Sequence, residues 1–160
     1  MNKEATGGCA CGAIRYRCRD RPIVELICHC RDCQRASGGA SAAVLLIASD
    51  RVIFEGADQA FHAVTTASGN RLSRGFCPAC GSPVSARWEG DSIYSKLQAL
   101  YAGSLDDPST FSPTVEDWVS RAYPWHTFHP DTLKFGERPT PQAVRDRIVA
   151  YFAARQPSSG

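Results

Sequence analysis

The sequence predicts a mainly β, antiparallel domain in which bound metal ions join the strands and one helix follows near the C-terminus. Three observations predict this class. Short apolar segments alternate with turn-forming residues along most of the chain. The 160 residues include eight cysteines, most of them in pairs or triplets with metal-ligand spacing. Only the segment 141–155 has the apolar period of a helix.

The composition fits a single domain over residues 1–160 that is long enough to bury a core. Lysine and arginine number 18 against 16 aspartates and glutamates, a balance that argues against a nucleic-acid partner. No apolar stretch is long enough to span a bilayer, and the N-terminus lacks an apolar signal segment. We therefore expect a cytoplasmic protein without a membrane partner. Disulfides are rare in the cytosol, so the grouped cysteines predict metal ligands or reactive thiols.

The chain begins with a glycine-rich loop and two predicted strands. Cys9 and Cys11 stand two residues apart among glycines, which permit the tight backbone needed around a metal. Residues 13–18 alternate between apolar and polar types, as in a half-buried strand, and residues 23–28 are predicted as a second strand. Cys18 shares the apolar face of the first strand, and we predict it to be a core residue because cysteine packs as a small hydrophobe.

The second strand leads into a cysteine triplet formed by Cys28, Cys30 and Cys33. Residues two apart in an extended chain point to the same side, so Cys28 and Cys30 converge while His29 points away. The two-residue gap before Cys33 is typical of a zinc knuckle. Three thiolates leave one of the four tetrahedral positions of zinc open, which is the pattern of a catalytic or substrate-binding site.

The middle of the chain predicts further strands joined by short turns. These strands are 40–48, 52–54, 61–66, 72–76, 84–88, 93–97, 98–102 and 115–121. We expect 61–66 and 72–76 to pair as antiparallel strands, and 84–88 and 93–97 to form a hairpin. Residues 103–114 are rich in Ser, Asp, Pro and Thr and are predicted to form an ordered loop.

A C-x-x-C pair, Cys77 and Cys80, follows a predicted strand directly and precedes a glycine, which is the layout of a zinc ribbon. The simplest partition joins this pair with Cys9 and Cys11 in a closed four-thiolate site and leaves the cysteine triplet as a three-thiolate site. Exchanging the pair of Cys9 and Cys11 with the pair of Cys28 and Cys30 gives the same number of ligands at each site. The spacing alone therefore leaves both partitions open. Either partition predicts two Zn²⁺ ions.

The helix is predicted over 141–155. Thr140 is positioned to cap it, and Pro141 suits its first turn. Its apolar residues recur at the i, i+4, i+7 and i+8 positions: Val144, Ile148, Tyr151 and Phe152. We expect it to pack on the sheet or on a partner subunit, so a homodimer through this helix is one expectation. Residues 156–160 are predicted to be disordered.

Three segments together carry a resemblance to a known family: Gly8–Gly12, residues 28–38 and residues 76–83. With these segments and the spacing of its seven grouped cysteines, the chain resembles the glutathione-dependent formaldehyde-activating enzyme family, which also includes centromere protein V, over residues 7–137. The resemblance implies a zinc-stapled, zinc-ribbon-like β-tent fold. It leaves residues 138–160 as a helical appendage with a tail. It also implies a structural zinc on Cys9, Cys11, Cys77 and Cys80, and a second zinc on Cys28, Cys30 and Cys33.

The activity that the resemblance implies is that of a carbon–sulfur lyase acting on a thiol–formaldehyde adduct, with glutathione as co-substrate and S-hydroxymethylglutathione as product. The cysteine triplet would then hold the catalytic zinc through its thiolates rather than attack the substrate. Two alternatives stay open at this stage. One is a glutathione or thiol carrier without a catalytic step, and the other is an interaction module in which both zinc ions are structural.

Four residues are predicted to contact a bound thiol: Gln34, Arg35, Ser37 and Trp125. The arginine offers a cation to a carboxylate of glutathione. The amide and hydroxyl side chains either bind the ligand or cap the turn after the triplet. The tryptophan either walls a pocket or packs in the core. His126 and His129 lie in a loop-like segment and are predicted to be surface residues.

Overall fold

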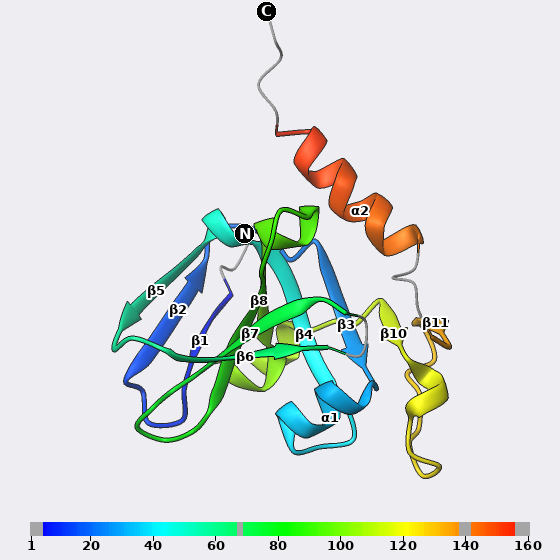
Figure 1. Cartoon of the computed structure of the whole chain (residues 1–160), viewed down its shortest axis with the longest axis horizontal. Helices are drawn as coiled ribbons and strands as arrows, with labels where there is room; N and C mark the ends of the chain where they lie inside the picture. Colours follow the sequence, from blue (N-terminus) through cyan, green and yellow to red (C-terminus); the bar gives the residue numbers. More distant parts are fainter. Residues whose placement is uncertain (1–4, 67–68, 138–141, 156–160) are drawn as a thin grey trace, which may run out of the picture.

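The computed structural model describes residues 5–66, 69–137 and 142–155, and these residues are mainly β (Figure 1). The strands are β1 (Thr6–Gly8), β2 (Ile14–Cys18), β3 (Val24–Cys28), β4 (Ala42–Ala48), β5 (Val52–Gly56), β6 (Ala60–Thr65), β7 (Arg71–Phe76), β8 (Pro83–Trp88), β9 (Leu97–Tyr101), β10 (Val115–Asp117) and β11 (Leu133–Phe135). The α-helices are α1 (Arg31–Ser37) and α2 (Gln142–Ala153). Short 3-10 helices are η1 (Ser49–Arg51), η2 (Ile93–Lys96), η3 (Ala102–Ser104), η4 (Pro108–Thr110) and η5 (Val119–Arg121).

The strands form two sheets. The smaller has the order β1-β2-β5, and the larger has eight strands in the order β11-β10-β3-β4-β9-β8-β7-β6. All described pairings are antiparallel except those of β10, which runs parallel to both of its neighbours, β3 and β11. The prediction of a mainly β, mainly antiparallel fold is therefore confirmed. The strands β1 and β11 were not predicted, because three residues are too few to show a period.

Most predicted strands lie within two residues of their observed bounds, and the antiparallel pairing of β6 with β7 is confirmed. Two predictions are wrong. Residues 93–96 form η2 rather than a strand, so β8 pairs with β9 instead. The strand predicted over 115–121 ends at Asp117, because Trp118 adopts a left-handed backbone with φ of 60° and ψ of 39°. This conformation interrupts the extended chain, and η5 follows.

The apolar core consists of two clusters on opposite faces of the larger sheet. Successive residues of a strand point to opposite faces, and β4 shows this directly. Leu45 and Ile47 belong to the first cluster, which includes the β2 residues Ile14 and Cys18, whereas Leu46 belongs to the second cluster. The predicted alternation of β2 and the predicted core position of Cys18 are both confirmed by burial.

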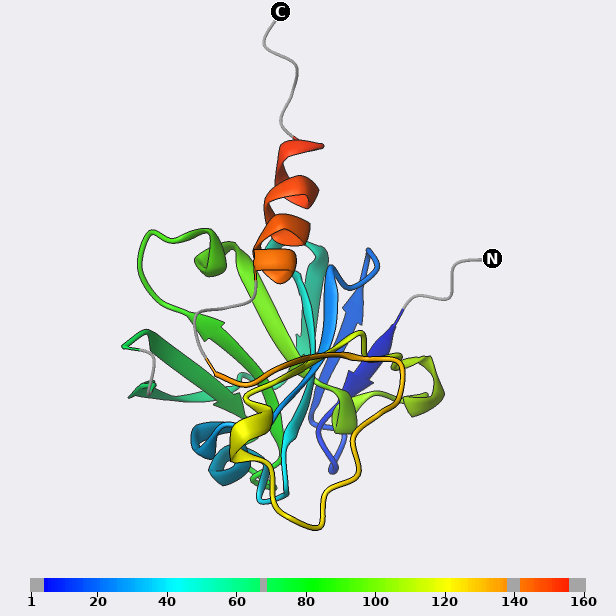
Figure 2. The same ribbon diagram turned by 90° about the vertical axis from the view of Figure 1, so that its right-hand side faces the viewer.

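Helix α2 packs onto the second cluster and lies at the opposite end of the sheet from α1 (Figures 1 and 2). Val144 and Ile148 are buried there, so the helix packs on the sheet of its own chain. The Tyr151 hydroxyl donates a hydrogen bond to Asp20 at 2.8 Å. A homodimer through this helix stays a prediction. Residues 138–141 and 156–160, with the predicted cap and tail, lie outside the described residues. No described helix is long and apolar enough to cross a bilayer.

We expect Ile148→Ala to lower the free energy of unfolding by about 3 kcal/mol, because it removes a fully buried side chain and leaves a cavity. The matched control is Val149→Ala on the same helix. Val149 is 51% exposed, and its truncation is expected to cost about 0.5 kcal/mol or less. Urea unfolding measures both values. Equal effects of the two variants would contradict the docking of α2 on the sheet.

Candidate functional site

Four cysteines from two distant loops meet at one end of the smaller sheet. Cys9 and Cys11 lie on the loop between β1 and β2, and Cys77 and Cys80 lie on the turn after β7. Their four sulfur atoms all lie within 4.8 Å of one another. The Cys9–Cys11 sulfur distance is 3.5 Å, and the Cys11–Cys77 distance is 3.8 Å. The structure therefore groups the cysteines as in the simplest partition.

These distances fit a tetrahedral zinc ion. Four sulfurs at about 2.3 Å from zinc are separated from one another by about 3.8 Å, whereas a disulfide holds its sulfurs about 2.05 Å apart. The protein also favours the thiolate form of two of these cysteines. A hydrogen bond from the Ile14 N–H lowers the pKa of Cys9, and hydrogen bonds from the side chain and backbone of Ser82 lower the pKa of Cys80 to about 5. The neighbouring Cys9 and Cys80 sulfurs outweigh a backbone hydrogen bond from Ala13 and raise the pKa of Cys11 to about 11, so a bound cation would be needed for it to ionise.

The cysteine triplet lies where β3 passes into α1. Cys28 ends β3, Cys30 is the N-cap of α1, and Cys33 lies in its first turn. The Cys30 sulfur accepts a hydrogen bond from the Cys33 N–H at 3.4 Å, which caps the helix. The helix ends at Gly38, whose φ of 69° is favourable for glycine. The predicted knuckle is thus the start of a helix that was not predicted.

The three sulfurs of the triplet lie within 4.8 Å of one another. Hydrogen bonds from the Cys28 and Cys33 thiols lower the pKa of Cys30 to about 2, and the same contacts raise the pKa of Cys28. The pKa of Cys33 is also raised, to about 12, so one thiolate, Cys30, is favoured beside two thiols, and a bound cation would draw the other two to ionise. Within the described ranges, no fourth cysteine, histidine or carboxylate joins this group, and Cys18 lies in the core. The triplet therefore fits a zinc ion with one position open.

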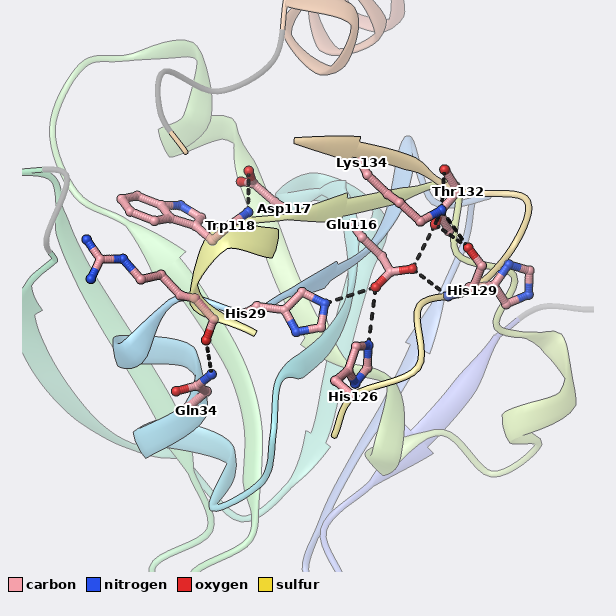
Figure 3. Close-up of polar contacts among 10 residues, drawn as sticks. His29, Gln34, Glu116, Asp117, Trp118, His126, His129, Thr132 and Lys134 are labelled. Carbon is pink, nitrogen blue, oxygen red and sulfur yellow. Dashed lines mark hydrogen bonds and ion pairs between the residues drawn. The ribbon is translucent and has the colours of Figure 1, made fainter. Parts of the chain in front are cut away.

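His29 lies between Cys28 and Cys30 in the sequence. Its side chain points away from them and into a buried cluster with Glu116 (Figure 3). The side chains of His29 and Glu116 are fully buried, and the His29 Nε2 donates to the Glu116 Oε2 at 2.9 Å. The same oxygen faces the Nε2 of His126 at 3.4 Å. The other oxygen accepts from the His129 N–H at 2.7 Å and from the Thr132 hydroxyl at 2.8 Å. Burial alone raises the pKa of Glu116, but these hydrogen bonds outweigh it and lower the pKa.

The cluster joins the triplet to the loop before β11. Its hydrogen bonds satisfy both carboxylate oxygens, so they account for the geometry without a metal. The predicted orientation of His29 is confirmed, and His129 is exposed as predicted. The prediction that His126 is a surface residue is wrong, since its side chain is only 17% exposed. No pattern in the sequence pointed to Glu116, because its partners lie 87 and 10 residues away.

A cavity of about 160 Å³ lies against the triplet. Its polar wall includes Arg74 of β7, Tyr101 of β9 and Trp118, none of which was predicted as a site residue. The left-handed backbone of Trp118 is uncommon for a non-glycine residue, and such conformations often occur at functional sites. Arg74 is close enough to Cys33 for its charge to act on the thiol.

The four predicted ligand contacts lie outside the wall of this cavity. Gln34 is buried and donates to the Arg121 carbonyl at 3.1 Å, and Ser37 donates to the Ser41 carbonyl at 2.8 Å. Arg35 is exposed. Trp125 is 70% exposed and stacks on Tyr123, so the alternative that it packs in the core is wrong. Their contact with a ligand stays a prediction.

We expect Glu116→Gln to lower the free energy of unfolding at pH 7 by roughly 3 kcal/mol, because at least two buried donors lose their acceptor. The pKa of Glu116 is lowered from 4.5 on folding. The carboxylate therefore stabilises the fold above pH 4.5, and this contribution is lost as the pH falls through the folded pKa. Urea unfolding from pH 7 to pH 4 should show the difference from the wild type shrinking at the acidic end.

The matched control for this variant is Glu25→Gln. Glu25 lies on β3, next in the sheet to the strand of Glu116, but burial raises its pKa. Its charge thus opposes folding at pH 7, and we expect its replacement to change stability by about 0.5 kcal/mol or less. A Glu116→Gln effect as small as that of the control, or one that is independent of pH, would contradict the role assigned to the carboxylate.

Comparisons with known proteins give a family, a relative and a structure to which the chain is similar. A family model described as "Glutathione-dependent formaldehyde-activating enzyme" matches residues 4–121. A protein of Halomonas elongata named "Putative glutathione-dependent formaldehyde-activating enzyme" is 29% identical over 104 residues, which span 62% of this chain and 64% of the relative. A crystal structure of a Rhodobacter sphaeroides protein has a TM-score of 0.52 at 14% identity, covering 69% of this chain and 98% of that one. This last similarity concerns the fold alone.

Proposed function

Because the chain belongs to the glutathione-dependent formaldehyde-activating enzyme family, we propose that it is a zinc-dependent carbon–sulfur lyase that forms S-hydroxymethylglutathione. The observation that carries this proposal is the cysteine triplet, which has three ligands for a zinc ion and faces a cavity. A closed four-ligand site would have no room for a substrate atom. We place the reaction in the cytoplasm, where thiols stay reduced.

We propose two zinc ions with different roles, which makes the fold a zinc-stapled β-tent. The group of Cys9, Cys11, Cys77 and Cys80 would hold a structural ion that joins the loop before β2 to the turn after β7. The triplet would hold the second ion. Bound there, zinc would favour the thiolate form of a substrate thiol, which is the nucleophile of the reaction.

The residues of the chain would position the reactants. The triplet cysteines act as ligands, and His29 fixes the backbone between two of them through its hydrogen bond to Glu116. The glutathione sulfur attacks the formaldehyde carbon, a C–S bond forms, and the carbonyl π electrons move to the oxygen. The thiol proton ends on that oxygen. Arg74 on the cavity wall is placed to stabilise the negative charge that develops there.

Exchange NMR with ¹³C-formaldehyde and glutathione tests the proposal, because it measures adduct formation and breakdown at equilibrium. We expect the wild-type protein at micromolar concentration to raise the exchange rate at least about tenfold over the uncatalysed rate. Zinc-loaded protein that binds glutathione but leaves the exchange rate unchanged would reject the lyase and support a thiol carrier. Protein that neither binds glutathione nor changes the rate would support a purely structural use of both zinc ions.

A further inference from the structure

The cavity beside the triplet extends along one face of the larger sheet. Side chains two residues apart on a strand point to the same face, and pairs of this kind line the cavity. Leu26 and Cys28 do so on β3, and Ala99 and Tyr101 do so on β9. Val144 of α2 also belongs to the lining. The cavity therefore reaches from the cysteines into the second apolar cluster, and the helix at the far end of the sheet closes part of it.

The floor of the cavity is apolar and is built from small side chains. Leu46, Ala99 and Ala86 are neighbours in register across β4, β9 and β8. The two alanines are only 4% and 5% exposed, and both line the cavity. The space exists because methyl groups stand where larger side chains would fill it. An apolar cavity of about 150 Å³ can hold a benzene molecule in another protein, so 160 Å³ suits about six carbon atoms.

Two residues in the wall of the same cavity have polar atoms that the protein itself leaves without a hydrogen-bond partner. Among the described residues, the buried Nε of Arg74 and the buried hydroxyl of Tyr94 have no hydrogen-bond partner. Both residues line the cavity. Buried donors in native proteins are normally paired. A ligand with an oxygen atom next to an apolar group would match the combination of this apolar floor with the guanidinium side chain of Arg74 in the wall.

We infer that the cavity is the binding site for an apolar alkyl or aryl group of about six carbon atoms, which in the proposed reaction is the substituent of the aldehyde. The part of this inference that concerns the aldehyde rests on the proposed function. Formaldehyde has no substituent and would leave the apolar floor without contacts. Glutathione carries two carboxylates, and these do not suit a floor of leucine and alanine.

The reaction with such an aldehyde needs no further reagent. The thiol sulfur forms a bond to the carbonyl carbon, the π electron pair moves to the oxygen, and the thiol proton is transferred to that oxygen. The product is a hemithioacetal that keeps the alkyl or aryl group. Arg74 would donate to the oxygen while the substituent packs against Ala86 and Ala99.

Binding is tested first with unreactive alcohols. Two of the three tryptophans, Trp88 and Trp118, line the cavity and report on its occupation by fluorescence. We expect 1-hexanol to bind on the order of 100-fold more tightly than ethanol, from the burial of four more methylene groups. Ala99→Leu fills the floor and should weaken hexanol binding at least tenfold. Ala63→Leu, at an exposed position of β6, should have no effect.

Circular dichroism tests whether Ala99→Leu is folded. If the leucine does not fit, Ala86→Val fills the same floor with less added volume. Hexanol that binds no better than ethanol, or equally well to the wild type and the folded filled variants, would overturn the inference.

Exchange NMR then compares the acceleration of glutathione adduct exchange for hexanal and for formaldehyde. We expect Ala99→Leu to lower the ratio of the hexanal acceleration to the formaldehyde acceleration at least tenfold. Acceleration with formaldehyde but none with hexanal would overturn the assignment of the cavity to the aldehyde while leaving the proposed function intact. Hexanol binding that depends on residue 99, without acceleration of either aldehyde, would support the apolar site and reject the proposed function.

Discussion

Cys77→Ser is expected to abolish cooperative folding, because it removes one ligand of the four-cysteine zinc site. Cys77 is fully buried and belongs to the first apolar cluster. Binding of a structural zinc is worth roughly 10–16 kcal/mol in small domains, whereas a whole domain is stable by only about 5–15 kcal/mol. We therefore expect the variant to lose most of its near-UV circular dichroism and to show no sigmoidal urea transition.

Cys18→Ala is the matched control for this variant. Cys18 is also a buried cysteine of the first cluster, but it belongs to neither group of ligands. We expect it to keep both zinc ions and a cooperative transition, with a loss of about 1 kcal/mol. Cys77→Ser protein that retains two zinc ions and wild-type stability would exclude a structural zinc at this site.

Cys30→Ala is expected to remove the second zinc and the acceleration of adduct exchange, while the domain stays folded around the first zinc. The triplet loses one of only three ligands, so the remaining two thiolates no longer hold the ion firmly. The rate measured by exchange NMR should fall to the uncatalysed value. Metal analysis should give one zinc per chain instead of two.

Cys30→Ser distinguishes the effect of losing the metal from the effect of losing the helix cap. Cys30 accepts the capping hydrogen bond of α1, and a serine oxygen keeps this acceptor but is a poor zinc ligand. We expect both variants to lose the second zinc and the activity, and only Cys30→Ala to lose a further 1 kcal/mol or so of stability. Full activity in either zinc-depleted variant would show that the second zinc has no catalytic role.

The sequence predicted those features that depend on neighbouring residues. The alternation of β2 and the i, i+4 period of α2 are local, and both survive in the structure because each element buries one face. The cysteine triplet is also local, so the spacing of its residues was enough to predict that its three sulfur atoms converge. Helix α1 was missed because seven residues show no apolar period and its N-cap is a cysteine, which is not a usual capping residue. Residues 93–96 resembled a strand because their apolar side chains pack on the second cluster.

The rest of the site depends on contacts between distant segments. Glu116 meets His29 across 87 residues of sequence, and no periodic pattern marks a single buried carboxylate. The cavity wall brings together side chains from several strands that are distant in the sequence. The sequence alone therefore does not identify Arg74 and Trp118 as site residues. Candidates near the triplet in sequence, such as Arg35, lie outside that wall because α1 turns them away from it.

Native mass spectrometry of the wild type and of Cys30→Ala, with and without glutathione, tests most directly whether the triplet holds a zinc with an open position. It counts zinc ions and bound thiol in the same spectrum. We predict two zinc ions and one glutathione for the wild type, and one zinc ion without glutathione for the variant. A wild-type protein with two zinc ions that binds no glutathione, or a variant with one zinc ion that still binds it, would contradict the account.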